Sequence, residues 1–65
     1  MLLKQGVVSS GEYVGWELQV VDDTNGETGG FYLVLRNDIE VFDYWFEKKE
    51  FLENQLADFD VHWKT

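Results

Sequence analysis

Residues 13–35 read YVGWELQVVDDTNGETGGFYLVL, and this stretch decides the fold. In its first part, residues on one face are apolar and residues on the other are polar or small: Val14, Trp16, Leu18 and Val20 against Gly15, Glu17 and Gln19. A period of two predicts a half-buried strand over residues 13–21. Asn25-Gly26 and Gly29-Gly30 then supply the positive φ angles that a turn needs, and Phe31–Leu35 is rich in aromatic and branched residues. The stretch therefore predicts a β-hairpin with a long loop.

Two further strands are predicted near the ends of the chain. Leu2–Val8 is short and apolar and ends at Ser9-Ser10-Gly11, so we expect it to pair with the strand over residues 13–21 through a tight turn. Residues 59–63 alternate again, with Val61 and Trp63 on one face. This last strand either joins an edge of the sheet or lies beside the first strand.

The spacing of apolar residues changes after Arg36 to the three-and-four pattern of one helical face: Phe42, Trp45, Lys49, Leu52, Leu56 and Phe59. Two residues could cap the start of this helix: Asn37, with Glu40 three residues later, or Asp43. Asp43 is favoured. The chain is thus predicted to be a single small acidic α+β domain over residues 1–65. Its expected order is β-β-β-α-β, with a three- to four-stranded, mainly antiparallel sheet and one amphipathic helix in two layers.

The charge of the chain restricts its partners. Thirteen acidic residues against five basic ones give a formal net charge of −8 in 65 residues. Such a surface repels nucleic acid and anionic membranes, so we expect neither as a partner and a basic protein surface instead. Apolar residues make up 45% of the chain, which is enough to predict a folded domain. The first residues lack the pattern of a targeting segment, and a cytoplasmic location is expected.

No catalytic, cofactor-binding or metal site is predicted. With no cysteine and one histidine, His62, the chain lacks the ligands of an ordinary structural zinc site. The acidic loop over residues 22–27 has the wrong spacing for an EF-hand, because neither its first nor its twelfth ligand position carries a carboxylate. Glu47 and Glu50 would stay solvated on an open helix face, which does not suit paired acid and base catalysis. We therefore expect no enzyme.

The predicted helix carries an acidic stripe on its solvent face: Asp43, Glu47, Glu50, Asn54 and Asp58. Carboxylates one turn apart repel each other, so this arrangement suggests selection for something other than stability. At 1.5 Å rise per residue, Asp43 lies about 6 Å from Glu47 and about 10.5 Å from Glu50 along the helix. These spacings are comparable to those of successive phosphates along a nucleic-acid strand. We expect Asp43, Glu47, Glu50 and Asp58 to bind the partner.

Two aromatic residues, Tyr44 and Phe51, lie on the flank of the predicted helix, and two interpretations of them remain open. They either widen the buried face or form an apolar patch that a partner or a second copy covers. Tyr32 and Val34 favour the second interpretation, because they lie on the strand face opposite Phe31 and a single helix can cover only one face of a sheet.

Two functional hypotheses follow. In the first, the chain is a small protein-protein interaction protein whose acidic face covers a basic, nucleic-acid-binding surface of its partner, as an inhibitor, immunity or anti-defence protein would. In the alternative, it is a self-associating assembly module, a homodimer for example, and its charge serves only solubility.

Overall fold

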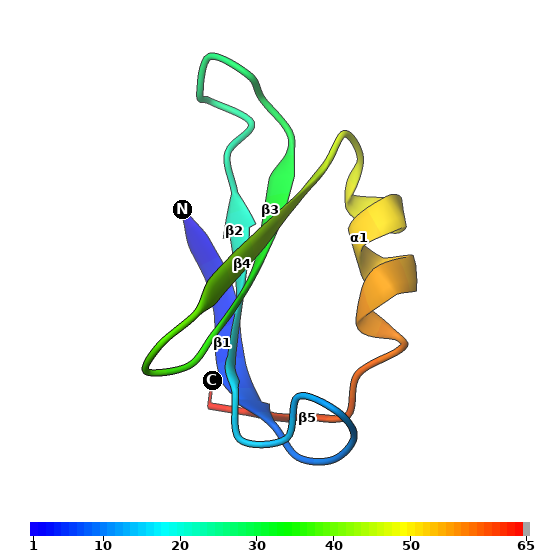
Figure 1. The fold of residues 1–65 in the computed structure, drawn as a ribbon. Helices are drawn as coiled ribbons and strands as arrows, with labels where there is room; N and C mark the ends of the chain where they lie inside the picture. The colour runs from blue at the N-terminus through cyan, green and yellow to red at the C-terminus, as the bar shows by residue number, and fades with distance from the viewer. Residues whose placement is uncertain (65) are drawn as a thin grey trace.

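The computed structural model describes residues 1–64, which form a five-stranded antiparallel sheet with one helix on one of its faces (Figure 1). The strand order in the sheet is β4-β3-β2-β1-β5. Along the chain the elements are β1 (Leu2–Val8), β2 (Glu17–Asp22), β3 (Phe31–Arg36), β4 (Val41–Phe46), α1 (Lys49–Leu56) and β5 (Val61–Trp63).

The predicted α+β class, with an antiparallel sheet and one helix, is confirmed, whereas the strand number was underestimated. β1 has the predicted bounds. β5 lies beside β1, and this position is also an edge of the sheet, so the two predicted positions of the last strand coincide. β2 begins four residues later than predicted. Gly11 and Gly15 have φ angles of 90° and 87°, so residues 11–15 form turns and leave Val14 exposed.

The prediction that the helix begins near Asp43 is wrong. Residues 41–46 form β4, and α1 begins at Lys49. The run Val-Phe-Asp-Tyr-Trp-Phe consists mostly of β-branched and aromatic residues, which favour a strand. Asn37 does not cap a helix either: its Oδ1 accepts hydrogen bonds from the backbone N–H groups of Ile39 (2.8 Å) and Glu40 (2.7 Å) and closes the turn between β3 and β4.

The strand separates two residues that the helical pattern had placed on one face. Phe42 pairs with Leu35 and turns toward the side of α1, where its ring stacks on Trp16 with centroids 5.7 Å apart. Trp45 pairs with Tyr32 and therefore lies on the opposite face of the sheet.

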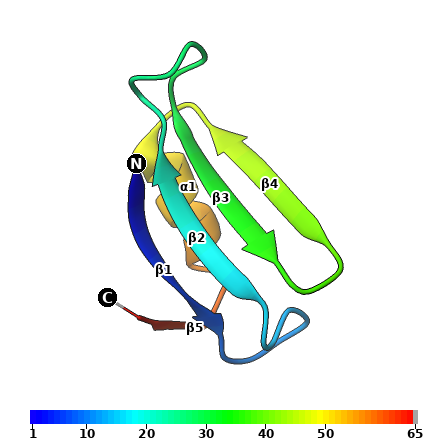
Figure 2. The same cartoon turned by 90° about the vertical axis from the view of Figure 1, so that its left-hand side faces the viewer.

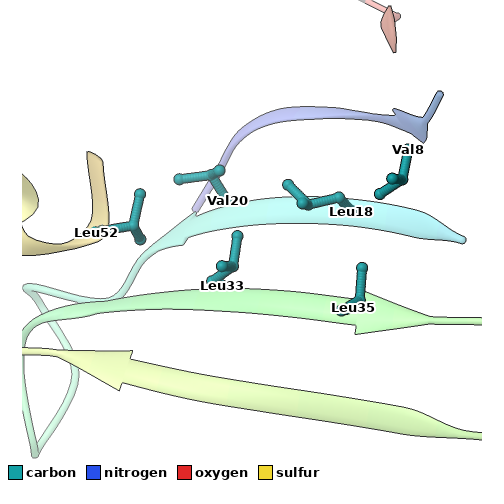
Figure 3. Packing of buried hydrophobic residues seen from close by; sticks show 6 residues of the cluster. All are labelled: Val8, Leu18, Val20, Leu33, Leu35 and Leu52. Carbon is teal, nitrogen blue, oxygen red and sulfur yellow. The ribbon is translucent and has the colours of Figure 1, made fainter. Parts of the chain in front are cut away.

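The core lies between the sheet and α1 and consists of six side chains that are at most 1% exposed: Val8, Leu18, Val20, Leu33, Leu35 and Leu52 (Figure 3). Leu52 is the one member that α1 contributes. An isolated helix of eight residues is unstable in water, so packing of Leu52 and of the partly buried Leu56 holds α1 in place. Burial of each such aliphatic side chain stabilises the fold by about 1.5–3 kcal/mol.

Candidate functional site

The sheet face opposite α1 has no element packed on it in residues 1–64. Figure 2 looks onto this face, with α1 behind the sheet. The strand registers arrange its side chains in three rows: Leu2, Val21, Tyr32 and Trp45; Gln5, Gln19, Val34 and Asp43; His62, Val7, Glu17, Arg36 and Val41. None of these residues is buried. We call this surface the open sheet face.

The first row is apolar and runs across four strands. Leu2 pairs with Val21, Val21 with Tyr32, and Tyr32 with Trp45. Leu2 and Trp45, at the two ends of this row, are 47% and 46% exposed. We call these four residues the apolar row. Large apolar side chains that share one exposed patch are typical of an interaction surface.

The side chain of Trp45 is held in place by the loop between β2 and β3. Its indole Nε1 donates a hydrogen bond of 2.9 Å to the carbonyl oxygen of Gly29. The ring also lies against Gly30, whose φ angle is 83° and where an added Cβ would lie 2.5 Å from Nε1. Trp45 is thus half exposed and yet oriented before any partner arrives.

A polar network occupies the part of the open sheet face next to the apolar row. Arg36 donates hydrogen bonds to Glu17 Oε1 from Nε (3.0 Å) and Nη2 (2.8 Å). Gln19 donates to the same Glu17 oxygen (3.1 Å) and to Gln5 Oε1 (3.4 Å). The Glu17 carboxylate therefore has partners within the chain, and the carboxylate of Asp43, in the same row as Gln19, is the other acidic group on this face.

The loop over residues 23–30 borders the apolar row and adds acidic groups beside it. Asp22 ends β2, and Asp23 and Glu27 follow in the loop. Asp22 Oδ1 accepts hydrogen bonds from the hydroxyl (2.6 Å) and the backbone N–H (2.9 Å) of Thr24, and these bonds lower the pKa of Asp22 below its ordinary value. Asp22 therefore stays ionised to a lower pH than an ordinary aspartate.

The structure breaks up the predicted acidic stripe, because the residues belong to different elements. Asp43 lies in β4 on the open sheet face, and Glu47 lies in the connection to α1. Glu50 is in the first turn of α1, and Asp58 follows the helix, where its Oδ2 accepts a hydrogen bond of 3.4 Å from Gln55. The single acidic helix face, with its phosphate-like spacing, is therefore wrong.

Tyr44 and Phe51 come from two elements but lie along the same side of the molecule. Tyr44 and Gln55 line a cavity of about 190 Å³ between the sheet and the end of α1, together with Tyr13, Leu33, Leu35 and Phe59. Phe51 precedes Gln55 by one helical turn and so lies on the same flank of α1. Tyr44 is 44% and Phe51 is 48% exposed, so neither is a core residue.

No family model matches this chain, and neither a curated protein nor a solved structure matches it.

Within residues 1–64, no group of three or more His, Cys, Asp or Glu side chains could hold a metal ion. The helix in this part of the chain is also too short and too polar to cross a bilayer. His62 is exposed and pairs with Val7 at the margin of the open sheet face.

The sequence pattern pointed to part of this site. Alternation had already placed Tyr32 and Val34 on an uncovered face, and their position there follows from the same alternation in β3. Trp45 was missed because the sequence predicts a helix that begins near Asp43. The signal that could have found it is the strand propensity of those six residues, which puts every second side chain on the face of Tyr32.

Proposed function

We propose that this protein binds a basic surface of another protein through its open sheet face and acts by covering that surface. A surface built to bind nucleic acid has the required charge, so the partner belongs to the proteins that bind or cleave nucleic acid. The chain would then serve as an inhibitor, immunity or anti-defence protein in the cytoplasm, with no chemistry of its own.

The observation that carries this proposal is the fixed orientation of Trp45 within the apolar row. Tryptophan and tyrosine are the residues in which binding energy is most often concentrated at protein interfaces. Immobilising a side chain on binding costs about 0.5–1.5 kcal/mol, and the hydrogen bond of Trp45 to Gly29 meets part of that cost in the free protein. Trp45 and Tyr32 are therefore the anchors that we propose.

The charge around the apolar row supports a basic partner. Asp43 lies on the same strand and the same face as Trp45, two residues before it, and the loop with Asp23 and Glu27 borders the row. The whole chain carries a net charge of −8. An excess of one sign speeds the encounter with a surface of the opposite sign.

The test compares two charge reversals that change the net charge equally. Asp43→Lys alters the open sheet face, whereas Glu50→Lys alters the first turn of α1 on the other side of the sheet. Tagged wild-type and variant proteins are used to capture partners from lysate at low and high salt. The captured protein is then purified and its affinity for each variant is measured by calorimetry.

We expect a basic protein that is captured at low salt and lost at high salt. Its affinity should fall by about tenfold or more with Asp43→Lys or Trp45→Ala, and should change by less than about threefold with Glu50→Lys. An equal loss with both charge reversals would mean that only the net charge matters, and the open sheet face would then not be the binding site.

The alternative function, self-association, is favoured by a different observation: most of the apolar residues of the edge strand β4 are exposed. Salt separates the two functions. Binding led by charge weakens as salt rises, whereas apolar self-association persists or becomes tighter.

A further inference from the structure

β4 is an edge strand in which the charge of Asp43 is the one feature of the kind that usually protects such an edge. It pairs with β3 on one side, and within residues 1–64 no strand pairs with its other side. Val41, Phe42, Tyr44 and Trp45 are between 37% and 63% exposed. Edge strands are normally short, or carry lysine, proline or a bulge, because unpaired backbone groups otherwise recruit another strand. β5, at the opposite edge, has three residues, whereas β4 has six and contains neither lysine nor proline.

The turn between β3 and β4 shows which backbone groups of β4 point outward. The N–H of Asn37 donates to the carbonyl oxygen of Glu40 (2.9 Å), so these two residues form a hydrogen-bonded pair. Hydrogen-bonded and non-hydrogen-bonded pairs alternate along an antiparallel ladder. Counting from residues 37 and 40, the backbone groups of Val41, Asp43 and Trp45 point away from β3 and are free to pair with another strand.

We propose that two copies of this chain dimerise by pairing their β4 strands antiparallel about a two-fold axis at Tyr44, which joins the two sheets into one. Residues directly opposite each other in a sheet have side chains on the same face, whereas neighbouring residues of one strand lie on opposite faces. A two-fold axis must therefore place one residue opposite the same residue of the second copy. An axis at Asp43 would place two Asp43 carboxylates opposite each other, and an axis at Trp45 would place Asp43 opposite Glu47. Like charges in these positions are destabilising.

With the axis at Tyr44, no two like charges lie directly opposite each other. Phe42 lies opposite Phe46 of the second copy on the side of α1. Asp43 lies opposite Trp45 of the second copy on the open sheet face, and both have outward-pointing backbone groups. The outward N–H and C=O groups of these two residues then form hydrogen bonds with each other, and the two-fold axis repeats this pair on the other side of Tyr44.

Charge complementarity at the ends of β4 is the reason to choose a second copy as the occupant. Glu40 precedes β4 and Lys48 follows it, and in this register Glu40 lies opposite Lys48 of the second copy. The two-fold axis repeats this pair, so each dimer has two of them. Lys48 has extended backbone angles (φ −126°, ψ 148°) and lies in the bend over residues 47–48 that leads from β4 into α1.

The dimer also accounts for Tyr44. Its half-exposed side chain would lie on the axis against Tyr44 of the second copy and so become covered. The open sheet faces of the two copies would form one continuous surface with both Trp45 residues near its centre. The dimer forms without the proposed basic partner, so its test uses the isolated chain and its failure leaves the proposed function untouched.

Sedimentation equilibrium of the isolated chain is the first measurement, and it should give a mass twice the 7.6 kDa of one chain. Glu40→Lys and Lys48→Glu should each weaken the dimer by about tenfold, because each variant replaces two attractive pairs by two repulsive ones. A mixture of these two variants should restore the affinity, since the mixed dimer has two attractive pairs. Glu40→Lys also lowers the net negative charge, so general charge repulsion predicts the opposite change. Glu12→Lys, in the turn before β2, is the control with the same change in charge.

Tyr44→Lys places two ammonium groups on the axis and should weaken the dimer by at least about tenfold, whereas Val14→Lys, in the turn between β1 and β2, should not. A circular dichroism spectrum verifies that each variant is folded. The proposal is overturned if the wild-type chain stays monomeric up to about 1 mM, or if the mixture of Glu40→Lys and Lys48→Glu is no tighter than either variant alone.

Discussion

Gly30 lies directly against the indole of Trp45, so closely that a Cβ added to Gly30 would be 2.5 Å from Nε1 and 2.8 Å from Cε2 of the ring. Gly30 also has a φ angle of 83°, which side-chain-bearing residues rarely adopt. The loop and the exposed tryptophan therefore fix each other: the glycines allow the ring to approach, and the hydrogen bond to Gly29 holds it there.

Replacing Gly30 tests this relationship. Gly30→Ala combines a strained φ angle with clashes against the Trp45 ring and the Phe46 carbonyl oxygen, and we expect it to lower the free energy of unfolding by about 2–4 kcal/mol. Gly29→Ala is the matched control, because its φ angle is 73° but no atom lies within 4 Å of the added Cβ. It should cost only the backbone strain, about 1 kcal/mol. Urea denaturation measures both values, and equal losses would show that the contact with Trp45 contributes nothing.

The hairpin from β2 to β3 could be predicted from the sequence because each of its signals agreed. Alternation placed Leu18 and Val20 inward, both of which are buried, and the glycines marked the loop. β1 and β5 were predicted for the same reason. In such segments the local pattern and the tertiary environment favour the same structure.

β4 could not be predicted in this way, because its apolar residues satisfy two periods at once. Phe42 and Trp45 are three residues apart, as on a helix, and they also belong to a six-residue run in which every residue but Asp43 is β-branched or aromatic, as suits a strand. Pairing with β3 decides between the two, and that contact is not local in the sequence. The error moved Asp43, Tyr44 and Trp45 onto a helix, so the acidic stripe was predicted and the apolar row was not.

Thr24 should control the pKa of Asp22. Its hydroxyl and backbone N–H both donate to the Asp22 carboxylate and favour the charged form, which lowers the pKa of Asp22 in the folded chain. Thr24→Val removes the hydroxyl bond, so the pKa of Asp22 should rise toward its ordinary value. Carboxyl carbon NMR titration measures this pKa. Thr28→Val, in the same loop, is the control and should leave the pKa of Asp22 unchanged.

The sign of the effect on stability follows from the direction of this shift. Because the folded pKa of Asp22 lies below the unfolded one, its contribution to stability is present at neutral pH. It is lost as the pH falls below the unfolded value and through the folded pKa. Acid unfolding of Thr24→Val should therefore begin at a higher pH than that of the wild-type chain. A variant with an unchanged acid transition and an unchanged Asp22 pKa would contradict the role given to Thr24.

Adjacent residues of α1 should differ sharply in their effect on stability. Leu52 is 1% exposed and packs into the core, so Leu52→Ala should cost about 2–5 kcal/mol, enough to detach the helix or unfold so small a domain. Phe51, at 48% exposure on the flank beside Tyr44, should cost less than about 1 kcal/mol when replaced by alanine. Urea denaturation at low protein concentration checks both variants. A loss from Phe51→Ala as large as that from Leu52→Ala would make Phe51 a core residue, and the flank that it shares with Tyr44 would then no longer be an exposed surface.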